Sequence, residues 1–151
     1  MSATVKNILD AWRSTSATSL GAGYQLLAHV YDVSKNNIRQ ARLAYGVRPL
    51  KADPVTTVNR TYTLDQTFEI ILTDTVARAA DTDAQVTTVL ETMYNKADEI
   101  FKLAVNTHLA LPTQVLNVFD PRLLEPEIID GETKVVVFRM QATVKHRSSL
   151  T

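Results

Sequence analysis

The sequence predicts an α+β protein in which a mostly antiparallel sheet packs on one long helix, with a short N-terminal helix added. Two segments carry the strand prediction, Tyr62–Thr73 and Lys134–His146, because apolar and polar residues alternate along both. A period of two places one face of a strand against a core and the other toward water or a partner. The third observation is a long apolar stripe with helical spacing between these two strands.

The N-terminal segment has the spacing of one helical face. Val5, Ile8, Leu9 and Trp12 stand at i, i+3, i+4 and i+7, so they predict a short amphipathic helix with Trp12 as a core anchor. We expect this helix to end in the polar run 14–16, before the glycines of a loop.

Residues 24–60 are predicted to be less regular. Tyr24–Val33 favours a strand, although a helix is an alternative, and both of its faces are largely apolar. It would lie in the centre of the sheet or against a neighbouring subunit. Pro49 and Pro54 predict an extended arm over residues 46–60, which is either a contact to an adjacent subunit or a surface loop.

The long helix is predicted over Thr82–Leu109. Thr82 and Gln85 form a capping-box pattern at its start, and Pro112 terminates it. Its apolar stripe is expected to cover the even-numbered faces of the two best strands. The predicted contacts place Phe68, Ile70, Phe138 and Met140 under Leu90, Ala97, Phe101 and Ala104.

The C-terminal part is predicted to be a hairpin. Val115–Phe119 is a short strand, and the Asp120-Pro121 and Glu125-Pro126 pairs are expected to break the chain after it. Ile128 and Ile129 lead into Asp130-Gly131, a strong hairpin turn before the last strand. Residues 148–151 are expected to be a flexible tail.

Composition limits the classes of protein that fit. The 151 residues suit one domain, residues 1–151, and the absence of cysteine excludes disulfides, thiol nucleophiles and cysteine metal ligands. No stretch is apolar enough to span a membrane, and the N-terminus lacks a signal core, so we expect a cytosolic product.

Charge is unevenly distributed, although its sum is zero. Residues 1–50 carry six basic and two acidic side chains, residues 51–130 carry six and thirteen, and residues 131–151 carry four and one. These numbers fit either scattered solvated faces or a subunit with unlike surfaces, suited to head-to-tail contact with copies of itself. The sequence contains no basic cluster with interleaved aromatics, so it does not predict specific nucleic-acid binding.

Catalytic patterns are missing from the sequence. His29 and Asp32 would point to opposite faces of a strand, and His108 is better explained as a surface residue at a helix end. We therefore expect no enzyme, no cofactor and no metal site. Three aspartates could attract a cation but lack calcium-loop spacing, and helix capping explains them better: Asp74, Asp81 and Asp83.

The order of elements resembles the tail terminator (tail completion) proteins of long-tailed bacteriophages over about residues 24–146. The segment Thr67–Asp74 (TFEIILTD) and the long helix with its segment Tyr94–Ile100 (YNKADEI) carry this resemblance. The pattern is one of strands and helices and contains no signature residues. Alternatives are another phage head–tail connector or neck protein, or a non-viral small ligand-binding α+β domain.

The resemblance implies a structural virion protein that acts through its surfaces. Such subunits form a hexameric ring that stops growth of the tail tube and forms the surface for head–tail joining. It implies a homo-oligomer that contacts the tail-tube protein and the head connector, with DNA passing through the lumen without specific binding. The location would be the head-proximal end of the virion tail, after assembly in the host cytoplasm. Candidate subunit-interface residues are Leu27, Tyr31, Val47, Arg48, Pro49, Leu50 and Pro54.

Overall fold

The computed structural model describes residues 2–27, 43–58, 61–77, 83–129 and 133–149. In these residues, each of the two α-helices is followed by three strands, and the strands form a mostly antiparallel sheet, which confirms the α+β prediction. The elements are α1 (Ser2–Leu20), β1 (Gln25–Leu26), β2 (Ala44–Val58), β3 (Thr61–Ala77), α3 (Asp83–Thr107), a 3-10 turn (His108–Ala110), β4 (Val115–Leu123), β5 (Glu127–Ile129) and β6 (Thr133–Ser149).

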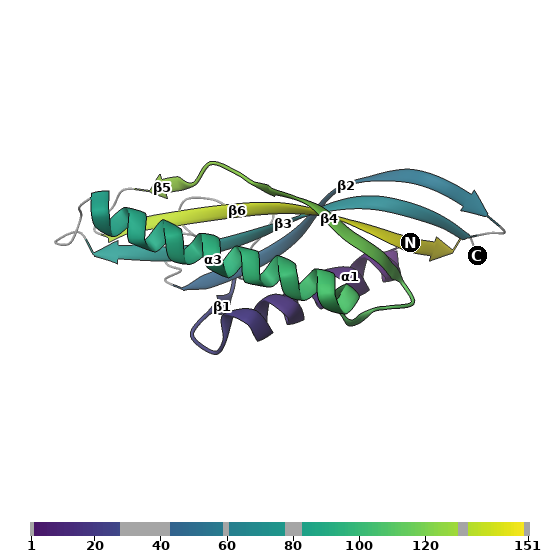
Figure 1. Cartoon of the computed structure of the whole chain (residues 1–151), viewed down its shortest axis with the longest axis horizontal. Helices are drawn as coiled ribbons and strands as arrows, with labels where there is room; N and C mark the ends of the chain where they lie inside the picture. The colour runs from purple at the N-terminus through teal and green to yellow at the C-terminus, as the bar shows by residue number, and fades with distance from the viewer. Residues whose placement is uncertain (1, 28–42, 59–60, 78–82, 130–132, 150–151) are drawn as a thin grey trace.

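The strands form one six-stranded sheet with the order β1-β2-β3-β6-β4, and β5 pairs with β6. All pairings are antiparallel except the short parallel one between β1 and β2. Helices α1 and α3 pack on one face of this sheet, here called the helix side. The opposite face is called the open side because no helix of the described residues packs on it. The last residues of β2, the first residues of β3 and the last residues of β6 lie together and extend beyond both helices (Figure 1).

The central strands β3 and β6 have the predicted alternation. Their even-numbered residues face the helix side, where Phe68, Ile70, Phe138 and Met140 belong to one buried cluster with Ala97 and Ala104. Leu90 and Phe101 are half-buried and pack against the same cluster, so the predicted core is confirmed.

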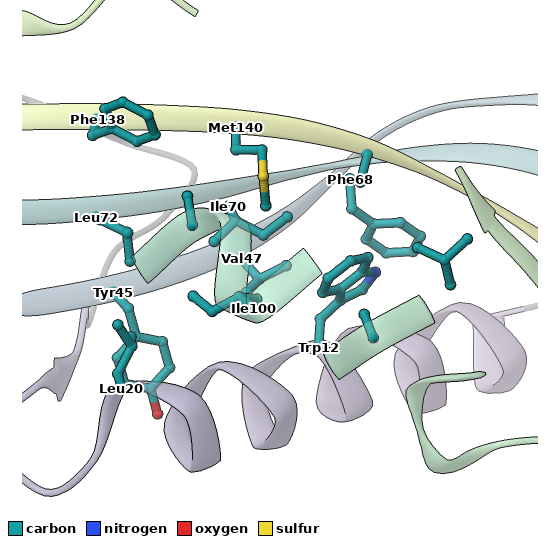
Figure 2. Close-up of a cluster of buried hydrophobic side chains, with 14 of the residues drawn as sticks. Trp12, Leu20, Tyr45, Val47, Phe68, Ile70, Leu72, Ile100, Phe138 and Met140 are labelled. Atoms are coloured by element: carbon teal, nitrogen blue, oxygen red, sulfur yellow. The ribbon is translucent and has the colours of Figure 1, made fainter. Parts of the chain in front are cut away.

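Helix α1 supplies the aromatic centre of this core. Trp12 is fully buried, and its ring lies 6.4 Å from the ring of Phe68 in β3, tilted by 43°. Figure 2 shows Trp12 rising from α1 toward Phe68, with Ile100 of α3 on the same side of the sheet. Tilted aromatic pairs at this distance add to the free energy gained by burial.

The end of α1 lies further along the chain than the sequence analysis predicts. The helix continues through the polar run to Leu20, which is buried, and Thr15 and Ser16 are buried as well. Serine and threonine cost a helix only about 0.5 kcal/mol each relative to alanine, so packing decides the boundary. Gly21 ends the helix with a φ of 84°, and its N–H donates to the Ala17 carbonyl at 3.0 Å.

The prediction of an extended arm over residues 46–60 is wrong for residues 46–58, which belong to β2. β2 pairs with β3 from Ala44 to Val58, and the register shifts after Pro49 and again after Pro54. Proline is accepted in edge strands and at irregularities of pairing, because no ladder hydrogen bond from its nitrogen is needed there. The two prolines therefore mark an irregular edge strand rather than an arm or a surface loop.

Two further boundaries differ from the prediction. Within Tyr24–Val33, only Gln25–Leu26 is a strand in the described part, and residues 28–42 lie outside the described residues. The predicted flexible tail is wrong for Ser148 and Ser149, because both pair with β3. Residues 150 and 151 lie outside the described residues.

The connection from α3 to β4 matches the predicted end of the helix. α3 ends at Thr107, and a 3-10 turn with positive φ values follows at His108, Leu109 and Ala110. Leu109 is buried, so the turn is held by the core. β4 continues past its predicted end at Phe119, because Asp120-Pro121 forms an irregularity inside the strand rather than a break.

A smaller cluster lies on the open side, where the sequence analysis expected water or a partner. Ile71, Ile129, Val135 and Val137 are buried there, and Leu27 packs against them. The odd-numbered face of β3 is therefore buried within the subunit near residues 69–73 and half-exposed near residues 63–67. β5 pairs with β6 as the hairpin prediction requires, and its turn lies outside the described residues.

Burial of His146 predicts a loss of stability in mild acid. Its Nε2 lies 3.1 Å from Gln66 Oε1, and burial lowers the pKa of His146, partly offset by the Arg147 backbone and Asp65. The unfolded chain, with a histidine pKa near 6.5, therefore binds a proton first. We expect the contribution of His146 to be complete above about pH 6.5 and to decline as the pH falls below that value.

Denaturation between pH 7.5 and 5.0, compared between wild type and His146→Gln, measures this contribution. The wild type is expected to lose more stability than the variant over this interval. Equal pH dependence in the two proteins would contradict it.

Candidate assembly surfaces

A network of charged side chains crosses the open side of the sheet. Arg48 donates from Nε to Glu69 Oε1 at 2.9 Å, and its Nη2 lies 2.8 Å from the same oxygen. Arg139 places Nε 3.7 Å from Glu69 Oε1 and donates from Nη1 to Glu127 at 3.2 Å. The Glu69 side chain is only 4% exposed, so two arginines compensate one buried carboxylate. The network joins β2, β3, β6 and β5.

A groove of about 700 Å³ lies further along the open side. Its walls come from β2 and β4 and its floor from β3 and β6. Asp65 on the floor has one carboxylate oxygen without a hydrogen-bond partner among the described residues, and that oxygen lies 3.9 Å from Lys145 Nζ. The lining residues are Leu50, Lys51, Asp53, Asp65, Thr67, Phe119, Asp120, Arg122, Gln141 and Thr143.

A second, more apolar groove of about 310 Å³ lies between α3 and β4 on the helix side. Tyr94 and Phe101 form its α3 wall, and Pro121 and Leu123 form its β4 wall. At its rim, Lys102 Nζ lies 2.8 Å from Asp98, and this hydrogen bond raises the pKa of Lys102. Lys102 therefore keeps its charge at neutral pH.

Large apolar side chains are exposed at the two edges of the sheet. Leu26 in β1 and Leu50 in β2 are exposed at one edge. Tyr94 in α3, Leu123 in β4 and Ile128 in β5 are exposed at the other. In the part of the chain that the structure describes, these five are the exposed large hydrophobic residues. The two edges are also unlike in sequence and in shape.

The elements at the two edges of the sheet differ in net charge. Residues 2–27 and 43–58, which form α1, β1 and β2, have four basic and two acidic side chains. Residues 83–129, which form α3, β4 and β5, have three basic and seven acidic ones. Arg13, Arg48 and Lys51 of the first group are each paired with an acidic side chain, so that edge is nearly neutral and the other edge is acidic.

The structure divides the predicted interface residues into several environments. Val47 lies in the core of the subunit and is thereby removed from the candidate interface. Leu27 packs on the open-side cluster, and Arg48 is held by Glu69. Leu50 is exposed, whereas Pro49 is half-buried opposite Phe68.

For two of the predicted interface residues the side chain is not described. Tyr31 lies outside the described residues. The backbone of Pro54 pairs with Leu64, and its side chain is not described.

Those residues weighed for chemistry that the structure describes do not converge on a site. His29, Asp32 and Asp81 lie outside the described residues. His108 is exposed, and its Nδ1 lies 3.3 Å from the Val115 carbonyl oxygen. Asp74 accepts a hydrogen bond from the Thr75 backbone at 2.7 Å.

Among the residues that the structure describes, no group of three or more potential ligands could hold a metal ion. No helix among them is both long and apolar enough to cross a membrane.

The groove between α3 and β4 was missed by the sequence analysis. Tyr94 lies off the buried stripe of α3, and this exposed aromatic on a helix was the available signal. The other wall depends on Pro121 and Leu123, which were expected to follow the end of a strand. No protein-family model matches the chain, and no curated protein is found to be similar.

Proposed function

We propose that this protein is a ring-forming tail terminator of a long-tailed bacteriophage. The observation that carries the proposal is the pair of unlike sheet edges, one nearly neutral with Leu26 and Leu50 and the other acidic with Tyr94, Leu123 and Ile128. Unlike edges on one subunit suit a heterologous contact, which gives a closed ring when its rotation closes. The resemblance of the sequence to terminator proteins supplies the number of six copies and the partners.

The sheet itself favours lateral association. Within the described residues, β2 beyond Tyr45 pairs only with β3, and β4 pairs only with β6. Each edge therefore presents backbone groups and apolar side chains that a neighbouring subunit can cover. The acidic excess of the α3–β4–β5 edge favours the head-to-tail orientation over a contact between two such edges, which would bring like charges together.

The partners follow from the proposed position at the head-proximal end of the tail. One surface of the ring binds the last ring of tail-tube protein, and the opposite surface receives the head connector. DNA passes through the lumen without specific binding. Assembly takes place in the host cytoplasm, and the chain performs no catalysis and requires no cofactor.

Infection with the gene disabled is the decisive experiment, supported by electron microscopy of the purified protein with and without tail tubes. We expect overlong, headless tails beside filled heads, and rings on the tube ends when the protein is supplied. Normal virions, or a block before heads are filled, would contradict the proposal. Tails of normal length that fail to join heads would instead indicate another head–tail joining protein.

The groove on the open side favours a second candidate, a small ligand-binding domain. Its volume of about 700 Å³ is in the range of ligand sites, and Lys51, Asp65 and Arg122 converge on it. Mass measurements separate the candidates. A monomer that never assembles on tubes, but gains thermal stability from a small polar ligand, supports ligand binding, whereas rings support the terminator.

A further inference from the structure

The apolar residues at the sheet edges identify a specific contact between neighbouring subunits. We propose that Leu26 on the β1 edge of one subunit packs against Ile128 and the α3–β4 groove of the next, so that all copies in the ring have the same orientation. The proposed partner is a second copy of this chain. The inference rests on the proposed ring and adds the surfaces that close it.

Leu26 and Ile128 stand on the same side of the sheet. Leu26 lies opposite Tyr45, and Ile128 lies opposite Val136. Tyr45 and Val136 both belong to the core on the helix side. Directly paired residues point to the same face of a sheet, so Leu26 and Ile128 both face the helix side at opposite edges.

The two residues also lie at nearly the same level along the strands. Across the sheet, Leu26 is paired with Tyr45, Tyr45 with Leu72, and Leu72 with Phe138. Ile128 lies opposite Val136, two residues further along β6 and therefore about 7 Å away in the strand direction. Copies placed side by side in one orientation consequently bring Leu26 of one near Ile128 of the next.

Exposure indicates that these side chains are available for contact. Leu26 is 49% exposed and Ile128 is 44% exposed, so each leaves much apolar surface in water within a single subunit. A single exposed leucine is ordinary, but here all five exposed large apolar residues of the described chain lie at the two edges. Tyr94 and Leu123 line the α3–β4 groove, and Leu123 lies opposite Met140, four residues along β6 from the partner of Ile128.

Charge disfavours one of the alternative pairings. The edge that carries Ile128 belongs to elements with an excess of acidic side chains, so a contact between two Ile128 edges would oppose like charges. The edge that carries Leu26 is nearly neutral, because Arg13, Arg48 and Lys51 are each paired with an acidic side chain of the same subunit. The head-to-tail pairing therefore covers the apolar residues of both edges without bringing two acidic edges together.

Chemical cross-linking tests this contact without interference, because the chain has no cysteine. Leu26→Cys and Ile128→Cys subunits are assembled on tail tubes separately and as an equal mixture, then treated with a short bis-maleimide cross-linker. We expect covalent dimers in the mixture and none in either variant alone. The double variant should give a ladder that ends at the mass of the ring.

Cross-linked dimers from Leu26→Cys alone would overturn the proposal in favour of a two-fold contact. Assembled rings without any 26–128 cross-link would overturn the interface and leave the proposed function standing. A 26–128 ladder, together with normal tails in the gene-disabled infection, would refute the function alone. A protein that never assembles on tubes at any concentration would overturn both.

A second readout uses charge at the contact. Leu26→Asp and Ile128→Asp are expected to abolish ring assembly, whereas the control Thr92→Asp adds the same charge to an exposed position on α3 and should assemble normally. Thermal unfolding of each variant establishes that the subunits are folded. Normal assembly of both edge variants would overturn the proposal.

Discussion

Replacing Trp12 by alanine is expected to lower the free energy of unfolding by about 3–5 kcal/mol, the range for truncation of a buried large aromatic. Trp12 is fully buried between α1 and the sheet, and its ring contacts Phe68. No other residue of α1 carries as large a buried side chain, so its loss leaves a cavity where the helix meets β3. Chemical denaturation at neutral pH measures the change.

Two further variants distinguish packing from other causes. Trp12 Nε1 has no hydrogen-bond partner among the described residues, so Trp12→Phe removes volume without breaking a hydrogen bond to them and should cost less than the alanine change. Leu26→Ala, at an exposed position, should change the free energy of unfolding by no more than about 0.5 kcal/mol. A Trp12→Ala loss below about 1 kcal/mol would show that α1 does not depend on this anchor.

The elements that sequence predicts best are those whose pattern is long and regular. β3 and β6 each alternate over more than ten residues, and α3 has a clear start signal at residues 82–85 and a stripe of many turns. In such segments the local preference and the buried face agree, so tertiary packing has nothing to override. The contacts of Phe68 and Met140 with the helices follow directly from that agreement.

The elements that sequence predicts wrongly are those in which one local signal opposes tertiary pairing. Pro49 and Pro54 argue against a strand, but a strand at the edge of the sheet accepts them at its register shifts. Asp120 argues for a break, but it adopts a φ of 56° and leaves β4 paired on both sides of the irregularity. These outcomes depend on which strand lies at an edge of the sheet, and no local sequence pattern predicts the strand order.

The candidate interface was harder to predict than the fold for the same reason. Val47 was a candidate interface residue within the predicted arm, whereas the structure places it in the core. Leu26 and Ile128 are more than a hundred residues apart, and only the strand order places them at opposite edges. The charge asymmetry of the sequence was visible, but its assignment to two edges required the sheet.

Replacing Glu69 by alanine is expected to cost about 3 kcal/mol of unfolding free energy, the low end of the range for removing one partner of a buried charge pair. Its side chain is 4% exposed and compensates Arg48 and Arg139, whose side chains are 27% and 20% exposed. Without Glu69, two largely desolvated guanidinium groups face each other across β3. Their remaining access to water is the reason for expecting the lower value.

Matched variants separate the charge from the rest of the network. Glu127→Ala removes the exposed outer partner of Arg139 and should cost no more than about 1 kcal/mol. Glu69→Gln keeps an acceptor without the charge and should fall between these two values. Combining Glu69→Leu with Arg48→Met should recover part of the loss, because an apolar pair replaces an unpaired charge. Equal losses for Glu69→Ala and Glu127→Ala would show that water, rather than Glu69, compensates the two arginines.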